Sequence, residues 1–220
     1  MLQRVVNLSF TMLLVTALPA AAMTITVSPD PPPMTDVLLG YDVAGDVGAY
    51  LCTHGRGTVV DIGQTFRLDQ ATVLERITIK VRPMSEGTTG ELVTLKFGTF
   101  SDPDDDSMNE LLAAETQILP AEIPTGEERY VTFDIFDLTL AAELQYGFLL
   151  GFTGGDHVKD ARLDMLHVGS DAYADGQAVE MAGAVTSPLG YDLVFFLHIR
   201  SVFIDGFESG DTSPWSATEP

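Results

Sequence analysis

Apolar and polar residues alternate in three segments of this chain, at positions 77–82, 93–97 and 131–135. In the first of them, isoleucine or valine occupies every odd position and threonine, lysine or arginine every even one. A period of two puts successive side chains on opposite faces of a strand, so each segment is predicted to form a β-strand with one buried face. Two further segments, 146–153 and 191–200, are more uniformly apolar, which is typical of central strands covered on both sides.

Short clusters of Gly, Pro, Asp and Ser separate these segments and have the chemistry of turns. They lie at 85–87, 102–104, 124–126, 154–156 and 187–188. Roughly eight to eleven short strands joined in this way predict an all-β fold, an antiparallel jelly-roll-like β-sandwich. Only two segments, 108–115 and 138–144, have a brief helical character.

The first 22 residues have the three regions of a cleavable signal peptide. Arg4 provides a positive charge near the start, 5–18 is a mostly apolar run, and Ala20 and Ala22 form an A-x-A site. The apolar run is shorter than the ~20 residues that cross a bilayer, so we expect cleavage rather than a retained membrane anchor.

Three further parts are expected after the signal peptide (1–22). Residues 23–35 contain four prolines and are predicted to form a stiff, extended leader. Residues 36–201 are predicted to form the β-sandwich domain, and 202–220 a C-terminal tail. We expect a secreted, periplasmic or cell-surface protein with no stable membrane insertion after signal cleavage.

Charge and cysteine content narrow the function further. The chain carries 32 acidic against 11 basic residues, a formal net charge of −21. Such a surface repels phosphate backbones and anionic lipids, so binding to nucleic acid or to a membrane surface is disfavoured. Cys52 is the only cysteine, so no intramolecular disulfide can form and stability must come from the hydrophobic core. Such a cysteine is commonly a small buried residue, although pairing with a second chain stays open.

Several motifs resemble those of a known group of domains. They are Gln64-Thr65-Phe66, the sequence LERITI at 74–79, VTFD at 131–134, LAAELQYGF at 140–148, and DAYADGQA at 171–178. This layout resembles bacterial secreted and surface β-sandwich domains that are found with varied C-terminal anchors and are similar to carbohydrate-binding modules. The resemblance covers roughly residues 60–200, and it implies a jelly-roll fold and a non-catalytic role without a particular ligand. The tail resembles a short segment of exported bacterial proteins and lacks an anchor's apolar helix, so we expect release.

The most acidic segment is 102–110, which holds Asp102, Asp104, Asp105 and Asp106. Carboxylate oxygens from a loop between strands can supply the six to eight ligands that calcium needs. The spacing differs from that of an EF-hand loop, which has Gly at its sixth position and Glu at its twelfth. Two interpretations stay open: a solvated acidic turn, which is the commoner case, and a site for structural calcium, the one cofactor that the sequence suggests.

A second polar segment contains Asp171, Tyr173, Asp175 and Gln177 at alternate positions. If the segment is extended, these side chains share one side of it. A tyrosine ring can cover the apolar face of a sugar while carboxylates and an amide bind its hydroxyls. We therefore predict a ligand-binding site here, the alternative being an ordinary polar loop with Tyr173 at its rim.

Sequence motifs for catalysis are absent. The chain has no G-x-S-x-G elbow, no H-x-x-x-H pair, no P-loop and no dinucleotide fingerprint. We therefore expect a secreted, non-enzymatic binding or structural module, with an extracellular or cell-surface glycan as the leading ligand. Two alternatives stay open: a polysaccharide hydrolase that uses an unidentified carboxylate pair, and a purely structural adhesion or matrix component.

Overall fold

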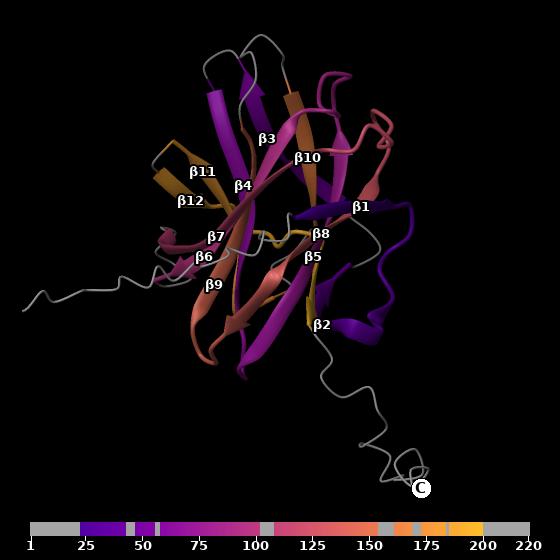
Figure 1. The fold of residues 1–220 in the computed structure, drawn as a ribbon. Coiled ribbons are helices and arrows are strands. Elements are labelled where there is room, and N and C mark those ends of the chain that lie inside the picture. Colours follow the sequence, from indigo (N-terminus) through magenta and orange to yellow (C-terminus); the bar gives the residue numbers. More distant parts are fainter. Residues whose placement is uncertain are drawn as a thin grey trace, which may run out of the picture.

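The alternating and apolar segments of the sequence form β-strands in the computed structural model (Figure 1). The structure describes residues 23–42, 47–55, 58–101, 108–153, 161–168, 173–183 and 185–199. The elements in these ranges are β1 (Thr24–Ser28), the 3-10 turn η1 (Met34–Asp36), β2 (Val37–Tyr41), β3 (Val47–Gly55), β4 (Thr58–Arg67), β5 (Thr72–Pro83), β6 (Leu92–Phe100), β7 (Met108–Ile118), β8 (Arg129–Leu140), β9 (Gln145–Phe152), β10 (Ala161–Val168), β11 (Ala178–Ala182), β12 (Val185–Pro188) and β13 (Phe195–Ile199). Among these residues no helix is long and apolar enough to span a membrane.

The strands form one continuous antiparallel hydrogen-bonded network. Its main path runs β1-β8-β5-β10-β3-β4-β9-β6-β7. Two branches leave this path: β13 pairs with β5 and carries β2, and β11 pairs with β4 and carries β12. Strands far apart in sequence are therefore neighbours, as with Phe195 of β13 opposite Ile79 of β5. The arrangement of the sheet therefore depends on pairing between strands that are distant in sequence, and it cannot be deduced from any one local segment.

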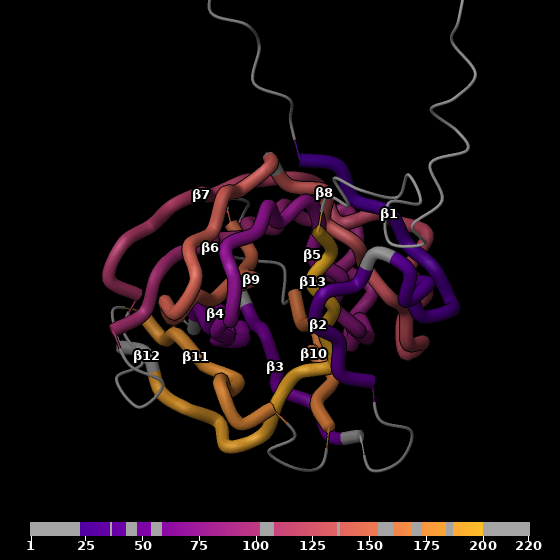
Figure 2. Tube along the Cα trace, turned by 90° about the horizontal axis from the view of Figure 1, so that it is seen from below, coloured from indigo at the N-terminus to yellow at the C-terminus, as the bar shows by residue number. Residues whose placement is uncertain are grey.

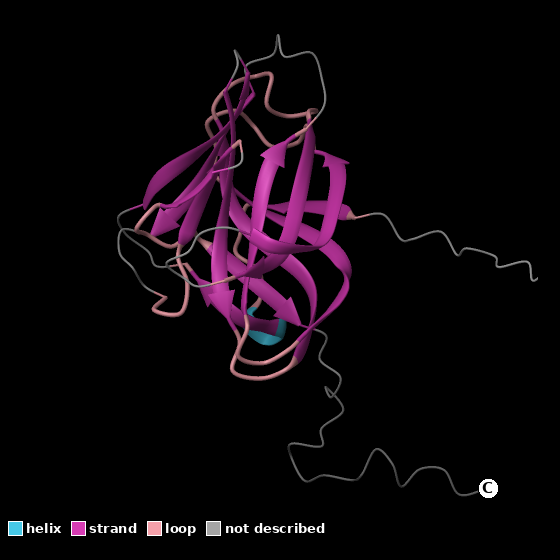
Figure 3. Ribbon diagram, turned by 90° about the vertical axis from the view of Figure 1, so that its left-hand side faces the viewer, coloured by secondary structure: helices cyan, strands magenta, loops and turns pink. Residues whose placement is uncertain are grey.

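The path bends back on itself, so that its two halves enclose the core. In the end-on view of Figure 2, β4, β9, β6 and β7 lie across from β8, β5, β13 and β2. The rings of Phe148 on β9 and Phe195 on β13 meet in the core with centroids 6.0 Å apart. Figure 3 shows strands throughout the described part of the chain, with η1 as a short helical turn. The all-β, antiparallel, sandwich-like fold predicted from the sequence is confirmed.

Burial along the strands follows the sequence pattern. Ile77, Ile79 and Val81 of β5 are fully buried, whereas Lys80 is only partly buried. Thr78 is an exception to the alternation, because it is polar and fully buried, with its hydroxyl 2.7 Å from that of Thr132. On β9, every residue from 146 to 152 is buried, as expected for a central strand, and β9 lies between β4 and β6. Alternation of apolar and polar residues thus indicates a strand with one face toward solvent, and a continuous apolar run indicates a strand that is buried on both faces.

Two predictions of helical character were wrong. Residues 108–118 form β7, which pairs with β6 in the register Leu95 opposite Glu115. Residues 138–140 end β8, and the chain then turns at 141–144, where Glu143 has a φ of 64°. Met, Glu, Leu and Ala favour helices by intrinsic propensity, but pairing with a neighbouring strand outweighs such weak preferences.

The sheet begins before the predicted domain boundary at residue 36. Thr24–Ser28 of the proline-rich segment forms β1, which pairs with β8 in the register Val27 opposite Val131. Met23 is 2% exposed and packs in the core. The prolines follow β1, where a missing N–H costs no ladder hydrogen bond. The predicted signal peptide (1–22) and tail (202–220) lie outside the described residues.

Candidate binding site

The segment 173–177 is fixed along the end of β4. The hydroxyl of Tyr173 donates to the carbonyl oxygen of Arg67 at 2.7 Å and accepts from the Arg67 N–H at 3.0 Å. Two residues earlier on β4, the Thr65 N–H donates to the carbonyl of Gln177 at 2.9 Å, and the Gln177 N–H donates to Oγ1 of Thr65 at 3.0 Å. Gly176 lies so close that a Cβ there would be 2.0 Å from the Thr65 carbonyl oxygen. A glycine is therefore required at this position.

A buried polar cluster supports the same segment from beneath. Asp192 and Gln64 are both fully buried. Gln64 Nε2 donates to Asp192 Oδ1 at 2.7 Å, and the Tyr173 N–H donates to Asp192 Oδ2, also at 2.7 Å. Gln64 Oε1 in turn accepts from the N–H of Leu193 at 2.9 Å. Buried polar groups are costly unless they are hydrogen-bonded, so this cluster fixes the position of residues 173–177 strongly.

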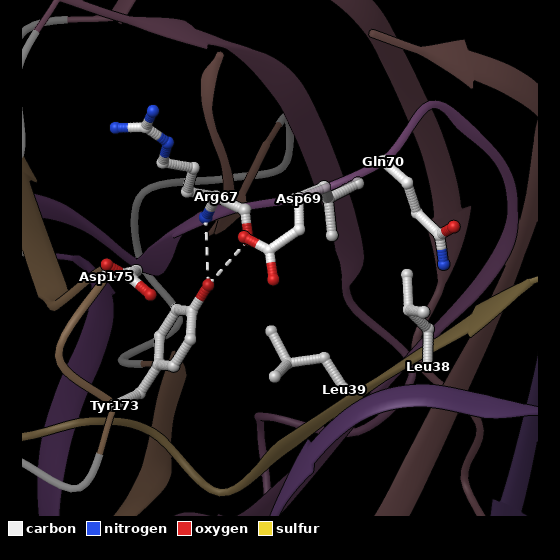
Figure 4. Close-up of a pocket in the computed structure, with 8 residues that line it drawn as sticks. Leu38, Leu39, Arg67, Asp69, Gln70, Tyr173 and Asp175 are labelled. Atoms are coloured by element: carbon white, nitrogen blue, oxygen red, sulfur yellow. Dashed lines mark hydrogen bonds between the residues drawn. The ribbon is translucent and has the colours of Figure 1, made fainter. Parts of the chain in front are cut away.

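A pocket of about 160 Å³ opens next to Tyr173 (Figure 4). It is bounded by β2, by the end of β4 with the turn that follows, and by the segment after β10. Its lining residues are Leu38, Leu39, Arg67, Leu68, Asp69, Gln70, Tyr173 and Asp175. Figure 4 shows the leucine side chains of β2 across from Asp69, and the Arg67 guanidinium directed away from those leucines. The wall thus combines apolar contacts with carboxylate, amide and phenol groups.

Tyr173 in the wall of the pocket and Tyr41, which packs against it, are both held in their neutral form. Burial raises the pKa of Tyr173 to about 12, and the negative charges of Asp175 and Asp69 contribute in the same direction. Burial also raises the pKa of Tyr41, as do the charges of Asp192 and Asp175. Both phenols therefore remain hydrogen-bond donors throughout the physiological pH range.

Arg67 is engaged by a carboxylate outside the pocket's lining. Its guanidinium forms a hydrogen-bonded ion pair with Glu143, in the turn after β8. This contact with Glu143 is the main reason that the pKa of Arg67 is raised. Both side chains are solvent-exposed, so the pair contributes little to stability, but it draws the positive charge toward Glu143.

Two of the four predicted ligand-binding residues line the pocket. Asp175 is exposed there, and Tyr173 forms part of the wall. The Tyr173 ring, however, is only 7% exposed and packs against Tyr41 with centroids 5.3 Å apart, so an open aromatic platform is not the arrangement found. Gln177 instead binds β4 through its backbone. Asp171 lies outside the described residues.

No sequence pattern links Leu38, Leu39 or residues 67–70 to the segment around Tyr173. Asp69 and Gln70 occupy a polar turn between two strands, which is a recognisable local signal. The contact between Tyr173 and Arg67, at the end of β4 just before that turn, however, spans 106 residues of sequence. It depends on strand pairing, which local patterns do not encode.

The predicted calcium ligands Asp102, Asp104, Asp105 and Asp106 lie outside the described residues, so that prediction stays open. Within the described part of the chain, no group of three or more His, Cys, Asp or Glu side chains could hold a metal ion.

No protein-family model matches this chain, and no curated protein matches it either. The functional argument therefore depends on the pocket itself.

Proposed function

We propose that the protein is an exported, non-catalytic binding module that holds a carbohydrate in the pocket between β2, the β4–β5 turn and residues 173–175. Export is supported by the order of charged, apolar and small residues in 1–22. The observation that carries the binding proposal is the mixed wall of the pocket, with Leu38 and Leu39 on one side and Asp69, Gln70 and Asp175 among its polar groups. Sugars present such a combination, an apolar ring face and a rim of hydroxyls.

The size of the pocket favours binding over cleavage. Its volume of about 160 Å³ is well below the ~300 Å³ at which pockets for drug-sized ligands begin. One sugar unit or a chain end fits such a space better than the two units that flank a scissile bond. Rigid support also suits recognition, because Tyr173 is fixed to Arg67 and Asp192 by three hydrogen bonds.

A hydrolase is the second candidate, and one observation favours it: two carboxylates, Asp69 and Asp175, line the same pocket. Glycosidases use a carboxylate pair that flanks the scissile bond.

Structural calcium on Asp102–Asp106 would be an addition to either function. It is tested by adding calcium to chelator-treated protein and following the melting temperature.

A glycan array followed by calorimetry on the exported protein tests the proposal. Gln70→Ala and Asp69→Ala remove polar groups from the wall, and Glu86→Ala is a control in the turn beyond the other end of β5. We expect at least one glycan to bind, with affinity lowered about tenfold by the pocket variants and unchanged in the control. Absence of binding to any glycan would overturn the proposal, and release of reducing sugar would replace it with the hydrolase.

A further inference from the structure

The wall of the pocket is unevenly charged. Asp69 and Asp175 are exposed acids that line it, and among the described residues of the lining Arg67 is the one basic group. The Arg67 guanidinium is already paired with Glu143. The positive charge of Arg67 thus interacts mainly with Glu143, outside the pocket's lining, and to a smaller extent with Asp175 and Asp69. Two acids therefore line the pocket beside one base that is already paired.

The buried layer beneath the pocket contributes a further carboxylate. Asp192 lies there, fully buried, with its carboxylate oxygens bound to Gln64 and to the Tyr173 N–H. The charges of Asp175 and Asp69 raise the pKa of Tyr173, and those of Asp192 and Asp175 raise the pKa of Tyr41, in each case after burial as the larger cause. Acidic side chains around the pocket thus act on the pKa of both phenols in the same direction as burial.

This distribution of charge discriminates among sugars. An ammonium group in this pocket would form charge-assisted hydrogen bonds with a lining carboxylate, Asp69 or Asp175, and such bonds are roughly twice as strong as neutral ones. A neutral hydroxyl or acetamide in the same place gains less, and a uronate carboxylate is repelled. The carbon frame of the ring would meanwhile lie against Leu38 and Leu39, across from Asp69 in Figure 4.

We infer that the pocket selects a carbohydrate with a free amine, such as a 2-amino-2-deoxyhexose unit, over N-acetylated, neutral or acidic sugars. The inference rests on the proposed carbohydrate-binding function and adds the ligand class. Asp69 and Asp175 are the specificity-determining residues, and Leu38 and Leu39 supply the apolar contact.

Calorimetry with three matched oligosaccharides tests this selection: a glucosamine oligomer, its N-acetylated form and a uronic acid oligomer. We expect the glucosamine oligomer to bind about tenfold or more tightly than the other two, and its affinity to fall as NaCl is added. Asp69→Asn and Asp175→Asn should each weaken binding of the amine about tenfold and leave the N-acetylated ligand unchanged. These substitutions preserve side-chain size, and the melting temperature confirms folding.

A control separates the pocket from the general acidity of the chain. Glu122→Gln removes one exposed acid in the β7–β8 connection, which lies beside Pro83 at the far end of β5. We expect it to bind the amine as the native protein does. A loss equal to that of the Asp69 variant would overturn the inference, because binding would then reflect net charge alone.

The remaining outcomes are also decisive. Equal or tighter binding of the N-acetylated or acidic oligomer would overturn the inference and leave the carbohydrate function intact. A simple alkyl diamine that binds as tightly as the amino sugar would show that the ring contributes nothing, which also overturns it. Absence of binding to every glycan would remove the proposed function itself.

Discussion

The hydroxyl of Tyr173 binds both backbone groups of one residue, Arg67, donating to its carbonyl oxygen at 2.7 Å and accepting from its N–H at 3.0 Å. The phenol thereby takes the place of a neighbouring strand where β4 reaches the pocket. Both hydrogen-bonding groups of a strand residue are thus satisfied by one side chain, which fixes Tyr173 in the wall of the pocket.

Tyr173→Phe tests this contact. Removing the hydroxyl leaves the N–H and C=O of Arg67 without that partner in a part-buried setting, so we expect unfolding free energy to fall by about 1–2 kcal/mol. Tyr191→Phe is the matched control, since its ring is 44% exposed. Denaturant unfolding of both variants measures the difference, and equal stabilities would show that the contact is energetically neutral.

Asp192→Asn tests the buried cluster beneath. Each carboxylate oxygen accepts from a donor, Gln64 Nε2 or the Tyr173 N–H, so an amide nitrogen in either place would face a donor. We expect a loss of about 2–3 kcal/mol, because a buried polar group that faces the wrong partner pays its desolvation penalty. Asp175→Asn, at an exposed position, should change stability by less than about 0.5 kcal/mol. If Asp192→Asn also lowered the unfolding free energy by less than about 0.5 kcal/mol, the proposed structural role of Asp192 in the buried cluster would be contradicted.

Alkaline pH should destabilise the fold through its tyrosines. Burial raises the pKa of Tyr50 and of Tyr173 from 10.0 to about 12. A phenol whose pKa is raised in the folded state keeps its proton longer than in the unfolded state. Its stabilising contribution is therefore complete below pH 10 and is lost as the pH rises toward 12. Tyrosinate absorbance followed against pH should show a late ionisation that is smaller in Tyr173→Phe; ionisation of both phenols near pH 10 would contradict it.

Gly151 makes room for a partly buried ion pair. A Cβ at this position would lie 1.9 Å from Oδ1 of Asp61, whose Oδ2 accepts from Lys96 Nζ at 2.7 Å. We expect Gly151→Ala to cost about 1–3 kcal/mol by overpacking. In an Asp61→Ala background the added methyl has space, so the same change should cost much less, and a double-mutant cycle of denaturation measurements reports the coupling. Strictly additive losses would mean that the two residues do not interact.

Cys52 should not react with thiol reagents in the folded protein. Its side chain is fully buried, Sγ lies 3.4 Å from the carbonyl oxygen of Leu150, and burial raises the pKa of the thiol. Because the thiolate is the reactive form, a thiol reagent should label Cys52 only after denaturation. Rapid labelling of the native protein, or a disulfide-linked dimer on a non-reducing gel, would refute this.

The strands were predictable because their signal is local. In β5, alternation alone distinguishes the buried Ile77 and Ile79 from the partly exposed Lys80. The same reasoning failed for β7, where Met108–Ile118 has helix-forming residues but pairs with β6. Propensity amounts to tenths of a kcal/mol per residue, and pairing with a neighbouring strand outweighs it.

The candidate site was predictable only in part. Tyr173 and Asp175 stand out in sequence because they alternate with small residues, and both line the pocket. The structural role of Tyr173 could not be predicted from the sequence, because its burial depends on contacts with the end of β4 and with Tyr41. Both lie more than a hundred positions earlier in the chain.

The sequence by itself determined the fold class, several of the strands and the acidity of the chain, because alternation and composition act locally or over the whole molecule. Only the tertiary structure decided that Leu39, Asp69 and Asp175 share one pocket. The physical reason is that antiparallel pairing brings together segments separated by most of the chain, and its register is set by the core as a whole.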